Sequence, residues 1–147
     1  GSQLLDWANT QVTVGEKSLS KIPSGILWGS DLDPNALILA KKNLARLGLD
    51  RTVRLSAGDA LTILPPCPPP GLVVTNPPYG ERMGTPEQSH ELFYNFAEHL
   101  KTNYKGYRAF LLSGDPKMHK GIHLKTSCKR PIRNGDIECR LLGYNLF

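Results

Sequence analysis

The stretch ILWGSDLDPNALILAKKNLARLG, residues 26–48, predicts a strand, a turn and a helix in direct succession. Its first five residues, Ile26 to Ser30, form a short apolar run that is typical of a buried strand. Asp33 precedes Pro34, which pairs an N-cap acid with a proline at the first helical position. Apolar residues then recur at helical spacing up to Gly48, where the helix is expected to stop.

The same alternation continues through the rest of the chain. Strands are expected at residues 53–56, 72–75 and 107–112, with helices at about 87–103 and shortly after residue 113. Five prolines within residues 65–70 predict a rigid connector without a helix. Two strand runs around Asn134-Gly135 predict a terminal hairpin. We therefore expect an α/β fold with a mostly parallel sheet and an antiparallel C-terminal hairpin at its edge.

The composition limits the classes of function. The chain has 147 residues, of which 39% are hydrophobic and 21% charged, and this fits one globular domain. No apolar run is long enough to cross a bilayer, so no membrane span is expected. Three widely spaced cysteines and four histidines show no metal-ligand spacing, which predicts no metal and a reducing, cytoplasmic location. The net charge of +5 favours a polyanionic partner such as nucleic acid.

Polar residues follow the first two predicted strands. In parallel sheets, ligands bind outside the carboxyl ends of the strands. Asp31 ends the first strand, where its carboxylate can accept hydrogen bonds from ribose hydroxyls or can cap the next helix; Asp33 fits the capping role better. Asp59 follows the second strand and can accept from the amino group of an adenine while the Ala60 N–H donates to a ring nitrogen. The alternative is an ordinary Gly-Asp turn.

The most specific cluster is TNPPYG, residues 75–80, after the third strand. An exocyclic base amine becomes nucleophilic when two oxygen acceptors draw on its hydrogens, and the Asn76 side chain and the Pro77 carbonyl can supply them. Pro77 and Pro78 stiffen the loop, and Tyr79 offers an aromatic face for an extruded base. The alternatives are a plain strand exit or a proline-rich ligand for a partner domain.

Several motifs resemble one family. Asn76-Pro77-Pro78-Tyr79 is similar to the (N/D)PP(Y/F/W) signature of S-adenosylmethionine-dependent amino-methyltransferases. The longer stretches resemble the bacterial 23S ribosomal RNA guanine-N2 methyltransferases that carry a THUMP domain and are often labelled N6-adenine-specific DNA methylases. Those stretches are TNPPYGERMG, GSDLDPNALILAKKNL, LLSGDPK and NGDIECRLLGYNLF, and the likeness covers residues 26–147.

The resemblance implies a Rossmann-like class I methyltransferase fold, S-adenosylmethionine as the methyl donor and a structured RNA as the substrate. It also implies roles for matching positions. The donor would be held by Asp31, Leu32, Asp59, Ala60 and Asn76. The target base would be held by Asn76, Pro77, Pro78 and Tyr79.

The sequence departs from this family at its start. Members carry a glycine-rich loop, typically DPxCGSGT, upstream of the ribose acid, and an N-terminal THUMP domain; neither precedes Asp31. We therefore expect a C-terminal fragment without the first strand: a poorly structured lead-in at residues 1–25, with Gly1-Ser2 as the scar of an expression tag, and a partial catalytic domain at 26–147. Such a fragment is expected to be inactive alone and able to associate with itself.

Three readings of the function stay open. The first is methyl transfer to guanine N2 of 23S rRNA, and the second is transfer to adenine N6 of DNA or RNA, because one acceptor pair serves either amine. The third is a noncatalytic module that binds nucleic acid. A run of basic residues near the C-terminus can contact RNA phosphates or form a solvated face: Lys117, Lys120, Lys125, Lys129, Arg130 and Arg133.

Overall fold

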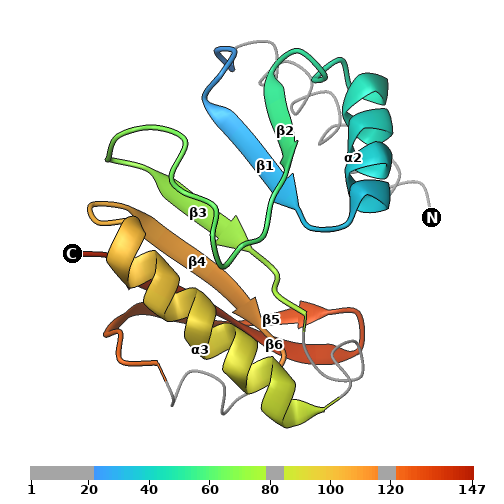
Figure 1. The fold of residues 1–147 in the computed structure, drawn as a ribbon. Helices are drawn as coiled ribbons and strands as arrows, with labels where there is room; N and C mark the ends of the chain where they lie inside the picture. The colour runs from blue at the N-terminus through green and yellow to red at the C-terminus, as the bar shows by residue number, and fades with distance from the viewer. Residues whose placement is uncertain (1–21, 79–84, 116–121) are drawn as a thin grey trace, which may run out of the picture. The chain divides into compact units, whose positions relative to one another are not determined.

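The computed structural model describes residues 22–78, 85–115 and 122–147, and the chain divides into two compact units, Gly1–Ala60 and Leu61–Phe147 (Figure 1). The elements follow the order β1 (Leu27–Asp31), α2 (Pro34–Arg46), β2 (Val53–Ala57), β3 (Leu72–Thr75), α3 (Pro86–Asn103), β4 (Arg108–Ser113), β5 (Thr126–Asn134) and β6 (Ile137–Asn145). Residues 1–21 of the lead-in lie outside the described residues, and so do residues 116–121, where most of the short helix expected after residue 113 falls.

The first unit confirms the predicted strand, turn and helix. Asp33 is the N-cap of α2, and its side chain accepts a hydrogen bond from the backbone N–H of Asn35 at 2.8 Å. The helix ends before Gly48, whose φ of 68° lies in the left-handed region that favours glycine. β1 and β2 are parallel, so the chain passes through α2 between them.

The burial of β1 differs from the prediction. Leu27 and Trp28 are 39% and 44% exposed, so the expectation of a buried strand is wrong. β2 is the only strand that pairs with β1 among the described residues, which leaves much of β1 uncovered. The Trp28 ring is partly covered by the guanidinium of Arg54, which lies 4.8 Å from the ring centroid.

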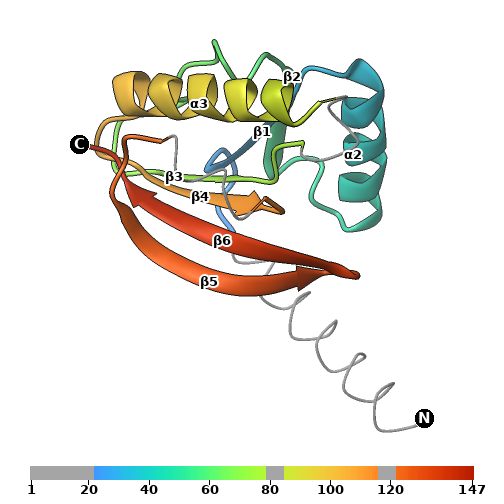
Figure 2. The ribbon, with the colours of Figure 1, turned by 90° about the horizontal axis from the view of Figure 1, so that it is seen from below.

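The second unit is a four-stranded sheet in the order β3-β4-β6-β5. β3 and β4 are parallel, whereas β6 runs antiparallel to both β4 and β5. Helix α3 lies along one face of this sheet (Figure 2). The core forms there, because Phe93, Phe96 and Leu100 of α3 pack in one cluster with Leu111 of β4 and Leu142 of β6.

The terminal hairpin is confirmed, and it forms an antiparallel edge of the sheet. Asn134 pairs with Ile137, so the two loop residues are Gly135 and Asp136, and Gly135 has a φ of 62°. Glycine is favoured at that position because the tight turn requires a positive φ.

In β3, the strand before the TNPPYG motif, half-buried residues alternate with exposed ones. Val73 packs against the core cluster, but Leu72 and Val74 are 55% and 69% exposed. The apolar run of β3 therefore does not correspond to a fully buried strand. Among the described strands of this sheet, β3 stands at one end of the order and pairs with β4.

The proline-rich connector reaches β3 without forming a helix, as predicted. It is held by Tyr107, whose hydroxyl donates to the carbonyl of Cys67 at 2.5 Å and lies 3.2 Å from the Cys67 sulfur. Burial raises the pKa of Tyr107 to about 12, and the contact with the Cys67 side chain acts in the same direction. A Cβ on Gly71 would lie 2.0 Å from Cε1 of Tyr107, so the connector and the ring fit only with glycine there.

Candidate functional site

The ribose and adenine residues predicted from the sequence lie together in the first unit. β1 and β2 are parallel and Asp31 pairs with Ala57, so both strands end at the same edge of the two-stranded sheet. The backbone N–H of Gly58 donates to the carbonyl of Asp31 at 3.1 Å, which ties the two strand exits together. Asp59 follows directly and is half-buried.

Asp31 and Asp33 have separate roles at this edge. Asp33 caps α2, whereas Oδ1 of Asp31 accepts a hydrogen bond from the backbone N–H of Asp33 at 2.8 Å. That bond fixes the Asp31 carboxylate in place while the residue stays exposed, as does Leu32 beside it. A carboxylate held at a strand end with solvent access is the group that fits a ribose, because it can accept from both hydroxyls. The described residues therefore fit the nucleoside part of the expected donor.

The predicted target residues begin directly after β3, in the second unit. Thr75, the last residue of β3, pairs with Leu111 of the parallel strand β4. Asn76 and Pro78 are exposed, and Pro77 between them is half-buried. This places the Asn76 side chain within reach of a ligand at the carboxyl edge of the sheet. Tyr79 lies outside the described residues.

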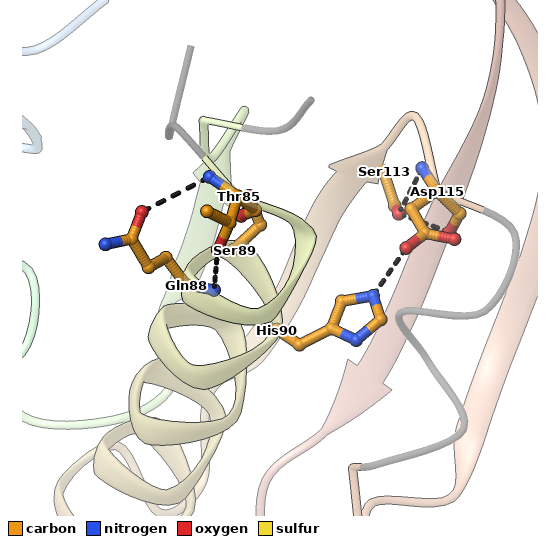
Figure 3. Close-up of polar contacts among 6 residues, drawn as sticks. All are labelled: Thr85, Gln88, Ser89, His90, Ser113 and Asp115. Carbon is orange, nitrogen blue, oxygen red and sulfur yellow. Dashed lines mark hydrogen bonds and ion pairs between the residues drawn. The ribbon is translucent and has the colours of Figure 1, made fainter. Parts of the chain in front are cut away.

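A polar cluster at the end of β4, which the sequence did not predict, lies at this same edge (Figure 3). The Ser113 hydroxyl donates to the backbone carbonyl of Asp115 at 2.9 Å. The Asp115 carboxylate lies 2.5 Å from Nε2 of His90, which projects toward it from α3. His90 and Asp115 are 25 positions apart, so no local pattern could link them.

The N-terminus of α3 is fixed by a capping box. The Thr85 hydroxyl accepts from the backbone N–H of Gln88 at 3.3 Å, and the Gln88 side chain accepts from the Thr85 N–H at 3.2 Å (Figure 3). Because α3 also carries His90, this cap holds the His90 contact to the end of β4. The described residues contain no group of three or more side chains able to hold a metal ion.

Solved structures identify the class of protein that this fold defines. One similar structure, a methyltransferase-type protein complexed with SAH, has a TM-score of 0.75 and 25% identity, and the match covers 82% of this chain and 32% of that chain. Another, a predicted N6-adenine-specific DNA methylase from Listeria monocytogenes, has a TM-score of 0.67 at 22% identity, covering 81% of this chain and 30% of that chain. The fold is that of a Rossmann-like methyltransferase, as predicted.

The sequence comparison identifies the family. Residues 5–142 match the model described as RMKL-like, methyltransferase domain, and the chain belongs to this family. A ribosomal RNA large subunit methyltransferase K/L from Shewanella loihica is 31% identical over 144 residues, which are 98% of this chain and 20% of that relative. The chain thus spans about a fifth of that relative's length. The family resemblance predicted from the motifs is confirmed, and the SAH-bound neighbour supports S-adenosylmethionine as the donor of this class.

Proposed function

We propose that the protein transfers the methyl group of S-adenosylmethionine to the exocyclic amine of a base in ribosomal RNA, with guanine N2 of 23S rRNA as the target. The observation that carries this proposal is the exit of β3, where Asn76 is exposed at the carboxyl edge of a parallel strand pair. Family membership and the name of the Shewanella relative support ribosomal RNA as the substrate class.

The acceptor chemistry follows from Asn76 and Pro77. The amine of guanine is a poor nucleophile because its lone pair is delocalised into the ring. If the Asn76 side-chain oxygen and the Pro77 carbonyl accept its two hydrogens, the nitrogen moves toward tetrahedral geometry and its lone pair can attack. Fixed φ angles at Pro77 and Pro78 hold the acceptors in place before the reaction, so little ordering is needed in the transition state.

The donor residues act by binding and orientation. When bound, S-adenosylmethionine would supply an electrophilic methyl group on a sulfonium: as the amine nitrogen bonds to the methyl carbon, the carbon–sulfur bond would break, S-adenosylhomocysteine would leave and the amine would lose one proton to solvent. The Asp31 carboxylate would hold the ribose, with Leu32 beside it, and Asp59 with the Ala60 N–H would read the adenine edge. Tyr79 would stack on the extruded target base. A ribosomal RNA substrate would place the activity in the cytoplasm.

Adenine N6 remains the second candidate target, because the same pair of acceptors serves its amine. The observation that favours it is the similarity in fold to the Listeria protein named as an N6-adenine-specific DNA methylase. That likeness is at 22% identity and so concerns the fold, whereas the relative named for ribosomal RNA is 31% identical. We therefore place guanine N2 in ribosomal RNA first.

Substitution of Asn76 in the intact protein tests the acceptor role. Asn76→Ala should lower methyl transfer to ribosomal RNA by roughly a hundredfold, the scale for losing one transition-state hydrogen-bond partner. Asn95→Ala, at an exposed position of α3, is the matched control and should leave transfer unchanged. Turnover by Asn76→Ala close to that of the wild type would refute the role of Asn76.

Donor binding separates the enzyme from a noncatalytic module. Isothermal titration of S-adenosylmethionine against the 147-residue chain and against the intact protein should show binding at least to the intact protein. Binding to neither would exclude the methyltransferase activity and leave the module that only binds nucleic acid. Binding to the intact protein alone would show that the donor site requires residues beyond this chain.

A further inference from the structure

A pocket of about 550 Å³ lies between the end of β4 and the outer part of the β5–β6 hairpin. Its lining includes Ser113 of β4, Arg133 of β5, and Glu138 and Arg140 of β6. The volume is within the roughly 300–1,000 Å³ typical of small-ligand sites, so the pocket can admit a nucleotide-sized group. None of its charged residues has a role in the proposed methyl transfer.

The strand register explains how the pocket forms. Ser113 and Arg140 are the last pair between β4 and β6, whereas β5 and β6 stay paired out to Asn134 and Ile137. The hairpin therefore projects past the end of β4 by three residues of β6, or about 10 Å (Figure 2). Its outer pairs, which include Arg133 with Glu138, form a wall beside Ser113.

The pocket lies at the same edge of the sheet as the proposed target site. β3 and β4 are parallel, so Asn76 and Ser113 leave the sheet in the same direction. Arg140 lies two strands away from Thr75, at about 4.8 Å for each strand, and two residues further along, so its backbone is about 12 Å from the end of β3. That distance is between about three and four rises of 3.4 Å between stacked nucleotides, so one RNA strand can reach both places.

The charges of the lining favour an anion. Arg133 and Arg140 outnumber the one acid, Glu138, and a guanidinium fork binds phosphate oxygens in pairs. Ile132, which is 39% exposed, adds an apolar surface that suits a ribose. Lys129 and Arg130 are exposed on the same strand and extend the positive charge along β5.

We propose that this pocket binds a phosphodiester group of the RNA strand that flanks the target base, with Arg133 and Arg140 as its phosphate contacts. The proposal rests on the proposed function, because it assumes that the substrate is a nucleic acid. The β5–β6 hairpin would then bind the RNA backbone, two strands of the sheet away from the base that enters the Asn76 site.

If the basic residues of β5 have a structural role instead, their substitution should have different effects. Among the described strands, β5 stands at one edge of its sheet, and basic residues on edge strands prevent pairing with other chains. If Arg133 served only that purpose, its loss would cause self-association without changing RNA binding at equal monomer concentration. The experiment therefore measures both properties.

The test measures binding of the intact protein to an unmodified 23S rRNA transcript by filter binding over a series of salt concentrations. Arg133→Gln and Arg140→Gln should each weaken binding about tenfold, the scale of one charge-assisted hydrogen bond, and lower the slope of log K against log salt by roughly 0.7 to 0.9. Glu138→Gln should strengthen binding, because it removes the negative charge of the pocket. Arg108→Gln is the matched control at the opposite end of β4 and should bind as the wild type does.

The opposite signs expected for Arg133→Gln and Glu138→Gln distinguish a phosphate site from damage to the hairpin, which would weaken binding in both variants. The pocket proposal is overturned if Arg133→Gln binds like Arg108→Gln, if Glu138→Gln binds more weakly than the wild type, or if self-association in size-exclusion chromatography is the only change. If Arg140→Gln fails to fold, the RNA affinity of Glu138→Gln tests whether the pocket binds phosphate. If the wild type methylates the transcript but the arginine variants bind RNA as tightly as the wild type, only the pocket proposal is refuted. If the wild type neither binds S-adenosylmethionine nor methylates the transcript, the proposed function is refuted.

Discussion

The two acids at the end of β1 allow a test that separates donor binding from folding. Asp31 and Asp33 are two positions apart, both are exposed, and each accepts one backbone hydrogen bond at 2.8 Å. We propose that Asp31 binds the ribose, whereas the structure shows Asp33 as the cap of α2. Substituting each in turn should therefore affect two different measurements.

Asp31→Asn keeps an oxygen that can accept from the Asp33 N–H, so the turn should survive. The change removes the negative charge, and two hydrogen bonds from ribose hydroxyls to a charged acceptor become bonds to a neutral one. A loss of about 1 kcal/mol for each bond gives about 2 kcal/mol, or about thirtyfold in affinity for S-adenosylmethionine. The melting temperature should stay close to that of the wild type.

Asp33→Ala should have the opposite effects: it should lower the melting temperature and leave the affinity for S-adenosylmethionine nearly unchanged. Loss of the N-cap costs about 1 kcal/mol, which corresponds to a fall in melting temperature of about 3 °C for a chain of this size. The affinity measured by titration of S-adenosylmethionine against the intact protein should change little, because Oδ1 of Asp31 keeps its bond to the backbone of residue 33. Wild-type affinity in Asp31→Asn, or loss of donor binding in Asp33→Ala without a loss of stability, would refute this division of roles.

Three further predictions concern the elements that hold the target loop and the end of β4. Gly71→Ala should destabilise the fold by about 2 kcal/mol in urea unfolding, because its Cβ would lie 2.0 Å from the Tyr107 ring; an unchanged midpoint would contradict this close packing. Burial raises the pKa of Tyr107 from 10.0 to about 12, so the stability that it contributes is complete below pH 10 and is lost as the pH rises through about 12. Tyr107→Phe should reduce this alkaline loss in unfolding curves, and an identical pH profile would show that another group causes it. Thr85→Ala removes one bond of the capping box and should cost about 1 kcal/mol, whereas Thr102→Ala, at an exposed position near the end of α3, should leave the unfolding free energy nearly unchanged.

Local signals in the sequence predicted the elements well. The Asp33-Pro34 pair marked the start of α2 to the residue, because capping is decided within one turn of helix. The Asn134-Gly135 pair marked the hairpin for the same reason, since its tight turn needs a residue with positive φ. These signals also placed Asp31 and Asn76 at strand ends, which is where the structure has them.

Features that depend on distant residues were not predictable. The apolar run of β1 indicated a buried strand, yet Leu27 and Trp28 are exposed, because burial depends on how many strands and helices cover the strand. His90 carried no signal for its contact with Asp115, which arises only when α3 packs along β4. The pocket beside Ser113 follows from the register of three strands, and a sequence does not show register between strands that are far apart in the chain.

The structure accounts for the stretch TNPPYG up to Pro78: a parallel strand ends, and Asn76 emerges at an edge suited to a ligand. Its proposed chemistry requires a base amine as the methyl acceptor. The most direct test is mass analysis of nucleosides in 23S rRNA from cells with and without the gene, followed by restoration with wild-type and Asn76→Ala protein. We expect that N2-methylguanosine at one position disappears with the gene, returns with the wild type and does not return with Asn76→Ala. Unchanged N2-methylguanosine, or the loss of N6-methyladenosine in its place, would contradict guanine N2 as the target.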